Sequence, residues 1–213
     1  MDWHSNGIRL IPHRKNARVF PCIFPCISLR ILHHGKGVML LLVLFASGVL
    51  ADALSERRAQ VGLNLFRTFV AADNDIARHV DSHNALLITM LYVGTSGAAE
   101  QYQRQLQKSL PSVKQLLTRI HVMSLSELLL HDGAPAAVFV TEKLSQHERE
   151  QLVNLSIDHR FLVFSPFEGD VEQGILGGLA VEARVRPVVN MNTLRAGDIP
   201  LKDFYLSVSR QYE

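Results

Sequence analysis

The segment VFSPFEGDVEQGILGGLAVEARVRPVVN, residues 163–190, joins an apolar run, an acidic turn, a glycine-rich run and a second run rich in β-formers. Its three glycines (Gly174, Gly177 and Gly178) allow close backbone packing where side chains would clash. Pro187 has no N–H to donate to a neighbouring strand, so it predicts a strand at a sheet edge. The segment therefore predicts an antiparallel hairpin near the C-terminal end of the chain.

The turn of this hairpin is expected at Glu182 and Ala183. Because side chains alternate across a strand, Arg184 and Arg186 should share one face of the return strand and Val185 the other. The three charged side chains Glu182, Arg184 and Arg186 are therefore expected at the solvent-exposed end of the hairpin.

Outward from the hairpin, apolar runs alternate with segments of helical periodicity. The predicted strands lie within residues 85–94, 119–125, 136–140 and 160–166, and the predicted helices within residues 57–70, 95–110 and 146–157. Nearly continuous apolar strands, separated by helices, are typical of a parallel sheet that is covered on both faces. The sequence predicts an α/β fold, a three-layer domain with a mostly parallel sheet flanked by helices and the antiparallel hairpin on the sheet edge.

Two segments of the sequence carry a specific signal for the first turn of a helix. Ser124 precedes Glu127, and Ser145 precedes Glu148, at the spacing of a capping box, in which each side chain accepts a hydrogen bond from the other residue's backbone. Each pair predicts the first turn of a helix that follows a strand.

The faces of the first and last helices follow from apolar spacing. The first helix is expected to turn an apolar face to the core, with Val61, Leu65, Phe66, Phe69 and Val70. The terminal segment, residues 201–212, predicts a helix whose core face holds Leu201, Phe204, Tyr205 and Val208.

The N-terminal residues 1–53 predict a leader. Residues 38–50 form an uncharged apolar run that follows Arg30 and Lys36 and ends at Ala51-Asp52-Ala53. A basic flank, a short apolar core and a small-x-small triplet are the parts of a secretory signal peptide, and thirteen apolar residues are short for a membrane span. We expect cleavage near Ala51–Ala53, export to the periplasm, and a single domain over residues 54–213.

Charge and cysteine content exclude several classes of site. Residues 54–213 hold 16 Lys/Arg and 18 Asp/Glu, a balance that argues against nucleic acid as a partner. The two cysteines, Cys22 and Cys26, lie in the leader. The domain itself therefore has no disulfide, cysteine zinc site or thiol nucleophile.

Motifs for catalysis are missing from the sequence. Gly94-Thr95-Ser96-Gly97 lacks the spacing of a nucleotide-binding loop and is expected to be a capped turn. His79 and His83 are expected on the surface rather than at a metal, and Asp170 and Glu172 on a solvated turn. We therefore expect no enzyme activity, no cofactor and no metal site.

The order of elements, and three segments in particular, resemble the YfiR-like family of exported bacterial proteins. RRAQVGLNLFRTFV (57–70) is similar to the family's opening helix, and AAVFVTEKLSQHEREQL (136–152) to a strand–turn–helix unit. Residues 161–208 resemble its closing segment, with Arg184, Asn190 and Arg195-Ala196-Gly197 at matching positions. The chain departs from the family at AADND (71–75), where Trp-Pro is common. It also has Pro166 where an acidic residue usually follows the serine of the turn.

The resemblance implies a non-enzymatic periplasmic regulator, and the family likeness favours a homodimer. Such a protein would bind the periplasmic part of an inner-membrane signalling protein, a diguanylate cyclase or a sensor kinase, and repress its output, in the first case cyclic di-GMP synthesis. The candidate partner-binding residues are Glu182, Arg184 and Arg186, because of their expected exposure.

The alternative is a periplasmic small-molecule (solute) binding protein. Loops at the carboxyl ends of parallel strands form ligand crevices in doubly wound folds. Residues 94–97, 141–143 and 165–170 would line that crevice, with Thr95, Ser96, Thr141 and Ser165 as the candidate ligand-binding residues.

Overall fold

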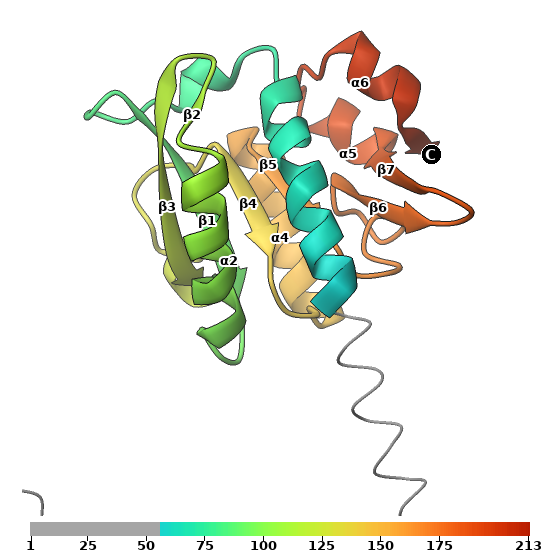
Figure 1. The fold of residues 1–213 in the computed structure, drawn as a ribbon, viewed down its shortest axis with the longest axis horizontal. Coiled ribbons are helices and arrows are strands. Elements are labelled where there is room, and N and C mark those ends of the chain that lie inside the picture. Colours follow the sequence, from blue (N-terminus) through green and yellow to red (C-terminus); the bar gives the residue numbers. More distant parts are fainter. Residues whose placement is uncertain (1–55) are drawn as a thin grey trace, which may run out of the picture. The chain divides into compact units, whose positions relative to one another are not determined.

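The computed structural model describes residues 56–213, which form an α/β domain (Figure 1). The predicted leader and its cleavage site lie outside the described residues.

Eight strands form a single sheet in the order β2-β3-β1-β4-β5-β6-β7-β8. The strands are β1 (Ala85–Tyr92), β2 (Ser112–Val113), β3 (Leu116–Ser124), β4 (Ala137–Val140), β5 (Leu162–Ser165), β6 (Gly177–Val181), β7 (Val185–Asn190) and β8 (Arg210–Tyr212). From β3 to β6 all neighbours are parallel, while β2 pairs antiparallel with β3, β7 antiparallel with β6, and β8 parallel with β7. The mostly parallel sheet and the C-terminal hairpin β6–β7 are as predicted.

Helices cover both faces of this sheet. The first helix spans residues 56–72, and the others are η1 (Ile76–His79), α2 (Gly97–Ser109), α3 (Leu125–Leu129), α4 (Gln146–His159), α5 (Met191–Ala196) and α6 (Asp203–Val208). In Figure 1 the first helix and α2 lie in front of the sheet and α4 lies behind it. Both predicted capping boxes are present, at the starts of α3 and α4.

Two apolar clusters fill the spaces between the layers. On one face the first helix, α2 and Tyr205 of α6 pack on the sheet, around the aromatic rings of Phe66, Phe139 and Phe164. The centroids of Phe66 and Phe139 are 5.3 Å apart, and Phe139 and Phe164 stack at 5.9 Å. On the other face α3 and α4 cover the remaining side chains of β4 and β5. Three layers around two apolar interfaces therefore hold the domain together.

Two glycines of the hairpin explain how β6 fits against its neighbours. A Cβ atom at Gly177 would lie 2.7 Å from the ring of Phe69, and one at Gly178 would lie 2.8 Å from the carbonyl oxygen of Ser165. Neither distance leaves room for a methyl group, so the predicted close backbone packing at these positions is confirmed.

The C-terminal segment differs from the prediction. The expected terminal helix stops at Val208, and residues 210–212 form β8 beside β7. The strand β7 is therefore not the edge strand that Pro187 predicts, because β8 pairs with it from Val188 to Asn190. Pro187 itself lies just before the part of β7 that β8 covers. Phe204 and Val208, predicted in the core, are 78% and 48% exposed, since a helix of one and a half turns buries only Tyr205.

The first helix also departs from the predicted face at one position. Phe66, Phe69 and Val70 are fully buried, but Val61 is 38% exposed. Gly62 and Leu63 face the sheet instead of Val61. The helix is thus rotated relative to the prediction, and Val61 lies at a surface groove described below.

None of the helices within residues 56–213 has the length and apolar character needed to cross a membrane.

Candidate functional site

The carboxyl ends of β1, β4, β5 and β6 meet at one edge of the sheet. The chain passes from β1 to β3 on one side and reaches β4 on the other, so the crevice between β1 and β4 is the switch point at which doubly wound folds commonly bind ligands. A second hollow lies further along the same edge, beyond β5 and β6.

The crevice between β1 and β4 is filled by the protein's own carboxylate, that of Glu142. The backbone amides of Val93, Gly94 and Thr95 donate to the two Glu142 carboxylate oxygens at 2.9, 2.6 and 3.0 Å, and Thr95 Oγ1 donates at 3.1 Å. Partial burial alone would raise the pKa of Glu142, but these hydrogen bonds outweigh it and lower the pKa. The loop after β1 therefore binds an anion, and that anion is the Glu142 side chain from the loop after β4.

The four residues predicted to line a ligand crevice are all committed to internal hydrogen bonds. Thr95 holds Glu142, and Ser96 Oγ donates to Glu100 on α2 at 2.7 Å. Thr141 is buried and donates to the carbonyl oxygen of Leu91, and Ser165 is buried and donates to Asp170. They lie along the same edge of the sheet, but none of them lines the larger hollow.

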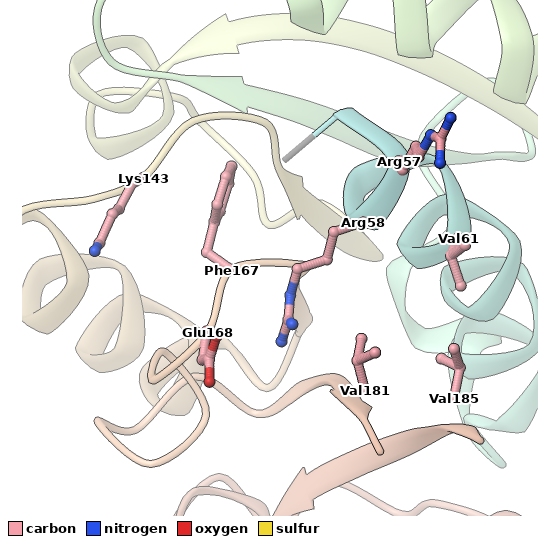
Figure 2. Close-up of a pocket in the computed structure, with 8 residues that line it drawn as sticks. All are labelled: Arg57, Arg58, Val61, Lys143, Phe167, Glu168, Val181 and Val185. Atoms are coloured by element: carbon pink, nitrogen blue, oxygen red, sulfur yellow. The ribbon is translucent and has the colours of Figure 1, made fainter. Parts of the chain in front are cut away.

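That hollow is an open groove of about 550 Å³. We call it the carboxyl-edge groove, and its lining residues are Arg57, Arg58, Val61, Lys143, Phe167, Glu168, Val181 and Val185. They come from the first helix, the loop after β4, the loop after β5 and the two strands of the hairpin. Figure 2 shows Val61, Val181 and Val185 gathered on one side of the Arg58 side chain and Phe167 on the other.

Arg58 is a fixed part of the groove rather than a free cation. Its Nε donates to the carbonyl oxygen of Pro166 at 2.5 Å, and its Nη2 donates to that of Leu179 at 2.9 Å. These bonds tie the first helix to the loop after β5 and to the hairpin, so three walls of the groove share one anchor. The charged ends of Arg57 and Lys143 lie at the rim, directed away from the valines (Figure 2).

A buried polar network holds the wall that carries Phe167 and Glu168. Arg149 of α4 donates from Nε to Asp170 at 3.1 Å, and both side chains are almost completely buried. The other Asp170 oxygen accepts from Ser165 Oγ, which in turn accepts from the backbone amide of Phe167 at 3.2 Å. The prediction that Asp170 lies on a solvated turn is therefore wrong: Asp170 is the internal anchor of that turn, while Glu172 is exposed.

The predicted partner-binding residues lie at the free end of the hairpin and are all exposed. Glu182 and Arg184 are in the turn itself, and only Arg186 is on β7, where it pairs with Ala180. Glu182 also forms an exposed ion pair with Arg210 at 3.1 Å. Arg184 is thus not on the return strand, because the turn is longer than the predicted two residues.

Residues 56–213 contain no group of three His, Cys, Asp or Glu side chains arranged to hold a metal. His79 is partly buried, and its Nε2 lies 3.0 Å from Arg78 Nε and 3.1 Å from the carbonyl oxygen of Arg160, while His83 is exposed.

Sequence reasoning missed Arg149, and it named Glu142 and Phe167 only as parts of the loops 141–143 and 165–170. A signal was present for Glu142, which stands two residues after the end of β4, at the expected switch point. For Arg149 there was little, because a charged residue in an otherwise polar helix is ordinarily solvated.

The sequence matches no protein-family model and no curated protein. Its fold is similar to two solved structures, which share 12% and 11% sequence identity with it. One is the ABC domain in complex with L-Trp from Streptococcus pneumonia, with a TM-score of 0.43 over 67% of this chain and 61% of that chain. The other is a conserved domain protein from Vibrio cholerae, with a TM-score of 0.45 over 65% of this chain and 60% of that chain. The chain thus spans about three fifths of the length of each.

Proposed function

We propose that the protein is an exported, non-enzymatic solute-binding protein that holds a small, mainly apolar molecule in the carboxyl-edge groove. The observation that carries this proposal is the groove itself. It has the size of a small-molecule site, lies at the carboxyl edge of a parallel sheet, and is lined by Val61, Phe167, Val181 and Val185.

The charges at the rim narrow the class of ligand. Arg57 and Lys143 form no ion pair or side-chain hydrogen bond with other described residues, and Glu168 supplies one negative charge against their two positive charges. A molecule with an apolar body and a carboxylate fits this arrangement, because the body can cover the valines while the carboxylate meets the cationic rim.

A thermal-shift screen tests the proposal. Small carboxylates with apolar bodies are compared with their amides, and the expected result is a rise in Tm for members of the first set only. In Val181→Asp the affinity of a hit should fall by about tenfold or more, since a carboxylate in the groove opposes both the apolar contact and the ligand's charge.

Val208→Asp is the matched control. Val208 is also a half-exposed valine, but it lies on α6 and outside the groove. Equal loss of binding in both variants, or no hit whose binding responds to Val181, would count against a ligand in this groove.

The second candidate function is the periplasmic regulator, which would bind an inner-membrane signalling protein through the hairpin. The observation that favours it is exposed apolar surface at the hairpin tip, where Val181 is 58% and Val185 42% exposed beside Glu182, Arg184 and Arg186. Residues at the tip of a hairpin can anchor a protein partner when the sheet behind them is rigid.

Affinity capture with tagged residues 54–213 from detergent-solubilised membranes separates the two candidates. Enrichment of an inner-membrane protein with a periplasmic domain and a cyclase or kinase output supports regulation, provided that Arg184→Glu reduces it. Recovery equal to that of an unrelated exported protein supports solute binding alone.

A further inference from the structure

The loop after β4, residues 141–145, joins that strand to α4 and contributes one residue, Lys143, to the lining of the carboxyl-edge groove. The Lys143 side chain is exposed, and within residues 56–213 it has no ion pair. How firmly this loop is held decides how precisely the cation is placed at the groove.

The residues just before Lys143 are fixed to the end of β1. Thr141 is buried, and its backbone amide and its Oγ1 both donate to the carbonyl oxygen of Leu91, at 2.9 and 2.7 Å. Glu142 accepts from three backbone amides of the loop after β1. Two consecutive residues of the loop are therefore tied to the neighbouring strand and to the loop that follows it.

The residues just after Lys143 are fixed by burial and by α4. Leu144 is buried in the apolar cluster beneath α3 and α4, and its carbonyl oxygen accepts from Arg149 Nη2 at 3.2 Å. Ser145 begins α4 through its capping box with Glu148. Lys143 is thus held between anchored neighbours, while its own side chain is left to solvent and to the groove.

The hydrogen bonds of Glu142 also keep its charge from pairing with Lys143. One carboxylate oxygen accepts from the amides of Val93 and Gly94, and the other accepts from the amide and the Oγ1 of Thr95. A carboxylate has about four lone-pair positions for donors, so these four bonds leave none for the adjacent ammonium group. A lysine that follows an acidic residue in the chain therefore stays available to a ligand.

We propose that Lys143 selects an anionic group of the ligand in the carboxyl-edge groove, and that Glu142 is the positioning residue that holds Lys143 in place. This inference rests on the proposed solute binding and adds the residues that determine its charge specificity. Because the loop is already ordered, little freedom is lost when Lys143 meets an anion, and more of their attraction appears as affinity.

Removal of the Glu142 charge separates positioning from a simple effect of charge. Glu142→Gln takes away one negative charge beside the groove, so Coulomb attraction alone predicts tighter binding of an anion. An amide NH₂ group cannot accept hydrogen bonds, so the variant loses part of the contact with the loop after β1, and the loop around Lys143 loosens. Positioning therefore predicts weaker binding of an anion, which is the opposite sign.

Two fluorescent probes test the proposal by titration of the purified protein near neutral pH. The first is 8-anilinonaphthalene-1-sulfonate, an apolar body with a negative charge, and the second is 1-anilinonaphthalene, the same body without the charge. Lys143→Gln should raise the Kd of the anionic probe by about three- to fivefold, which is the range for one exposed charge pair. Glu142→Gln should raise it by about two- to threefold. The Kd of the neutral probe should stay the same in both variants.

Two further variants distinguish positioning from a general loss of structure. In Glu142→Gln/Lys143→Gln the effect of the Glu142 change should vanish, because no cation is left to position. Lys108→Gln is the matched control, since Lys108 is an exposed lysine near the end of α2 and outside the groove. It should change neither Kd. Circular dichroism checks that each variant is folded.

The outcomes separate this inference from the proposed function. If Val181→Asp leaves the binding of both probes unchanged, the groove is not their site, and both proposals fail. The assignment of Lys143 and Glu142 alone is overturned if Val181→Asp weakens both probes but Lys143→Gln leaves the ratio of their Kd values unchanged. An equal change of that ratio in Lys108→Gln, or tighter binding of the anionic probe in Glu142→Gln, would also overturn it.

Discussion

The crevice between β1 and β4 and the carboxyl-edge groove lie on the same edge of one sheet, yet one is closed and the other open. In the first, three backbone amides already hold the Glu142 carboxylate. In the second, apolar side chains from the hairpin and the first helix surround about 550 Å³ of free space. The difference shows that the topological switch point identifies where a ligand can bind, while the side chains of the neighbouring loops decide whether that place is available.

The largest expected effect comes from breaking the network behind the open groove. Arg149→Met leaves Asp170 buried without its partner, and we expect the free energy of unfolding to fall by about 3–5 kcal/mol. Urea denaturation followed by circular dichroism measures it.

The matched control is the double change Arg149→Met/Asp170→Leu, which removes both charges. It should recover a large part of the lost stability, because no isolated charge is left in the core. A double variant no more stable than Arg149→Met would mean that the ion pair is not what holds the loop after β5.

A smaller effect is expected where the hairpin meets that loop. Gly178→Ala places a methyl group against the carbonyl oxygen of Ser165, and overpacking of this kind costs about 1–3 kcal/mol. Gly97→Ala is the comparison, since a Cβ there meets no atom within 4 Å. Thermal unfolding of both should show a lower Tm for Gly178→Ala only, and equal Tm values would disprove the close approach of β6 to β5.

The contribution of the closed crevice between β1 and β4 to the free energy of unfolding should depend on pH. The pKa of Glu142 is lowered in the folded protein, so its stabilising contribution is complete above the unfolded value, about 4.3, and is lost as the pH falls through the folded value. Glu142→Gln should therefore lower the free energy of unfolding by about 1–2 kcal/mol at neutral pH, and by less as the pH drops below about 4.

The control for this experiment is Glu100→Gln, a nearby carboxylate that accepts from Ser96 outside the crevice. A stability difference for Glu142→Gln that stays constant between about pH 3 and 7 would contradict a charged carboxylate in the loop amides.

The smallest effect is expected at the tip of the hairpin. Arg184→Glu changes an exposed turn residue with no ion pair among the described residues, so the free energy of unfolding should change by less than about 0.5 kcal/mol. A sharp loss of stability in guanidinium denaturation would show that Arg184 is structural and cannot serve to test partner binding.

The sequence predicted the fold well where local signals and tertiary packing agree. The uncharged run of β1, the two capping boxes and the glycines of β6 each specify one local structure, and all are found. The C-terminal segment was mispredicted because helical spacing of Leu201, Phe204 and Tyr205 was read without knowledge of β7. Once β7 is formed, its open backbone groups favour a strand over residues 210–212.

The sequence predicted where on the fold a ligand site would lie, but not which side chains would be free to form it. The carboxyl edge follows from the order of strands and helices, but which hydroxyls are free there depends on contacts between distant residues. Ser165 is taken by Asp170 and Thr95 by Glu142, 47 positions away in the chain. Spacing along the sequence carries no information on such pairs, and this is also why the buried partner of Asp170, Arg149, was missed.

The order of strands has a consequence for how the chain is made. The eight residues of β1 are uncharged and all but Tyr92 are buried, and the strands that pair with β1, namely β3 and β4, both come later in the sequence. While the chain is being synthesised or carried unfolded, β1 is an apolar segment with strong β-propensity and no strand to pair with. The strand that forms the centre of the finished sheet is therefore the segment of the described chain that most needs protection from aggregation before folding is complete.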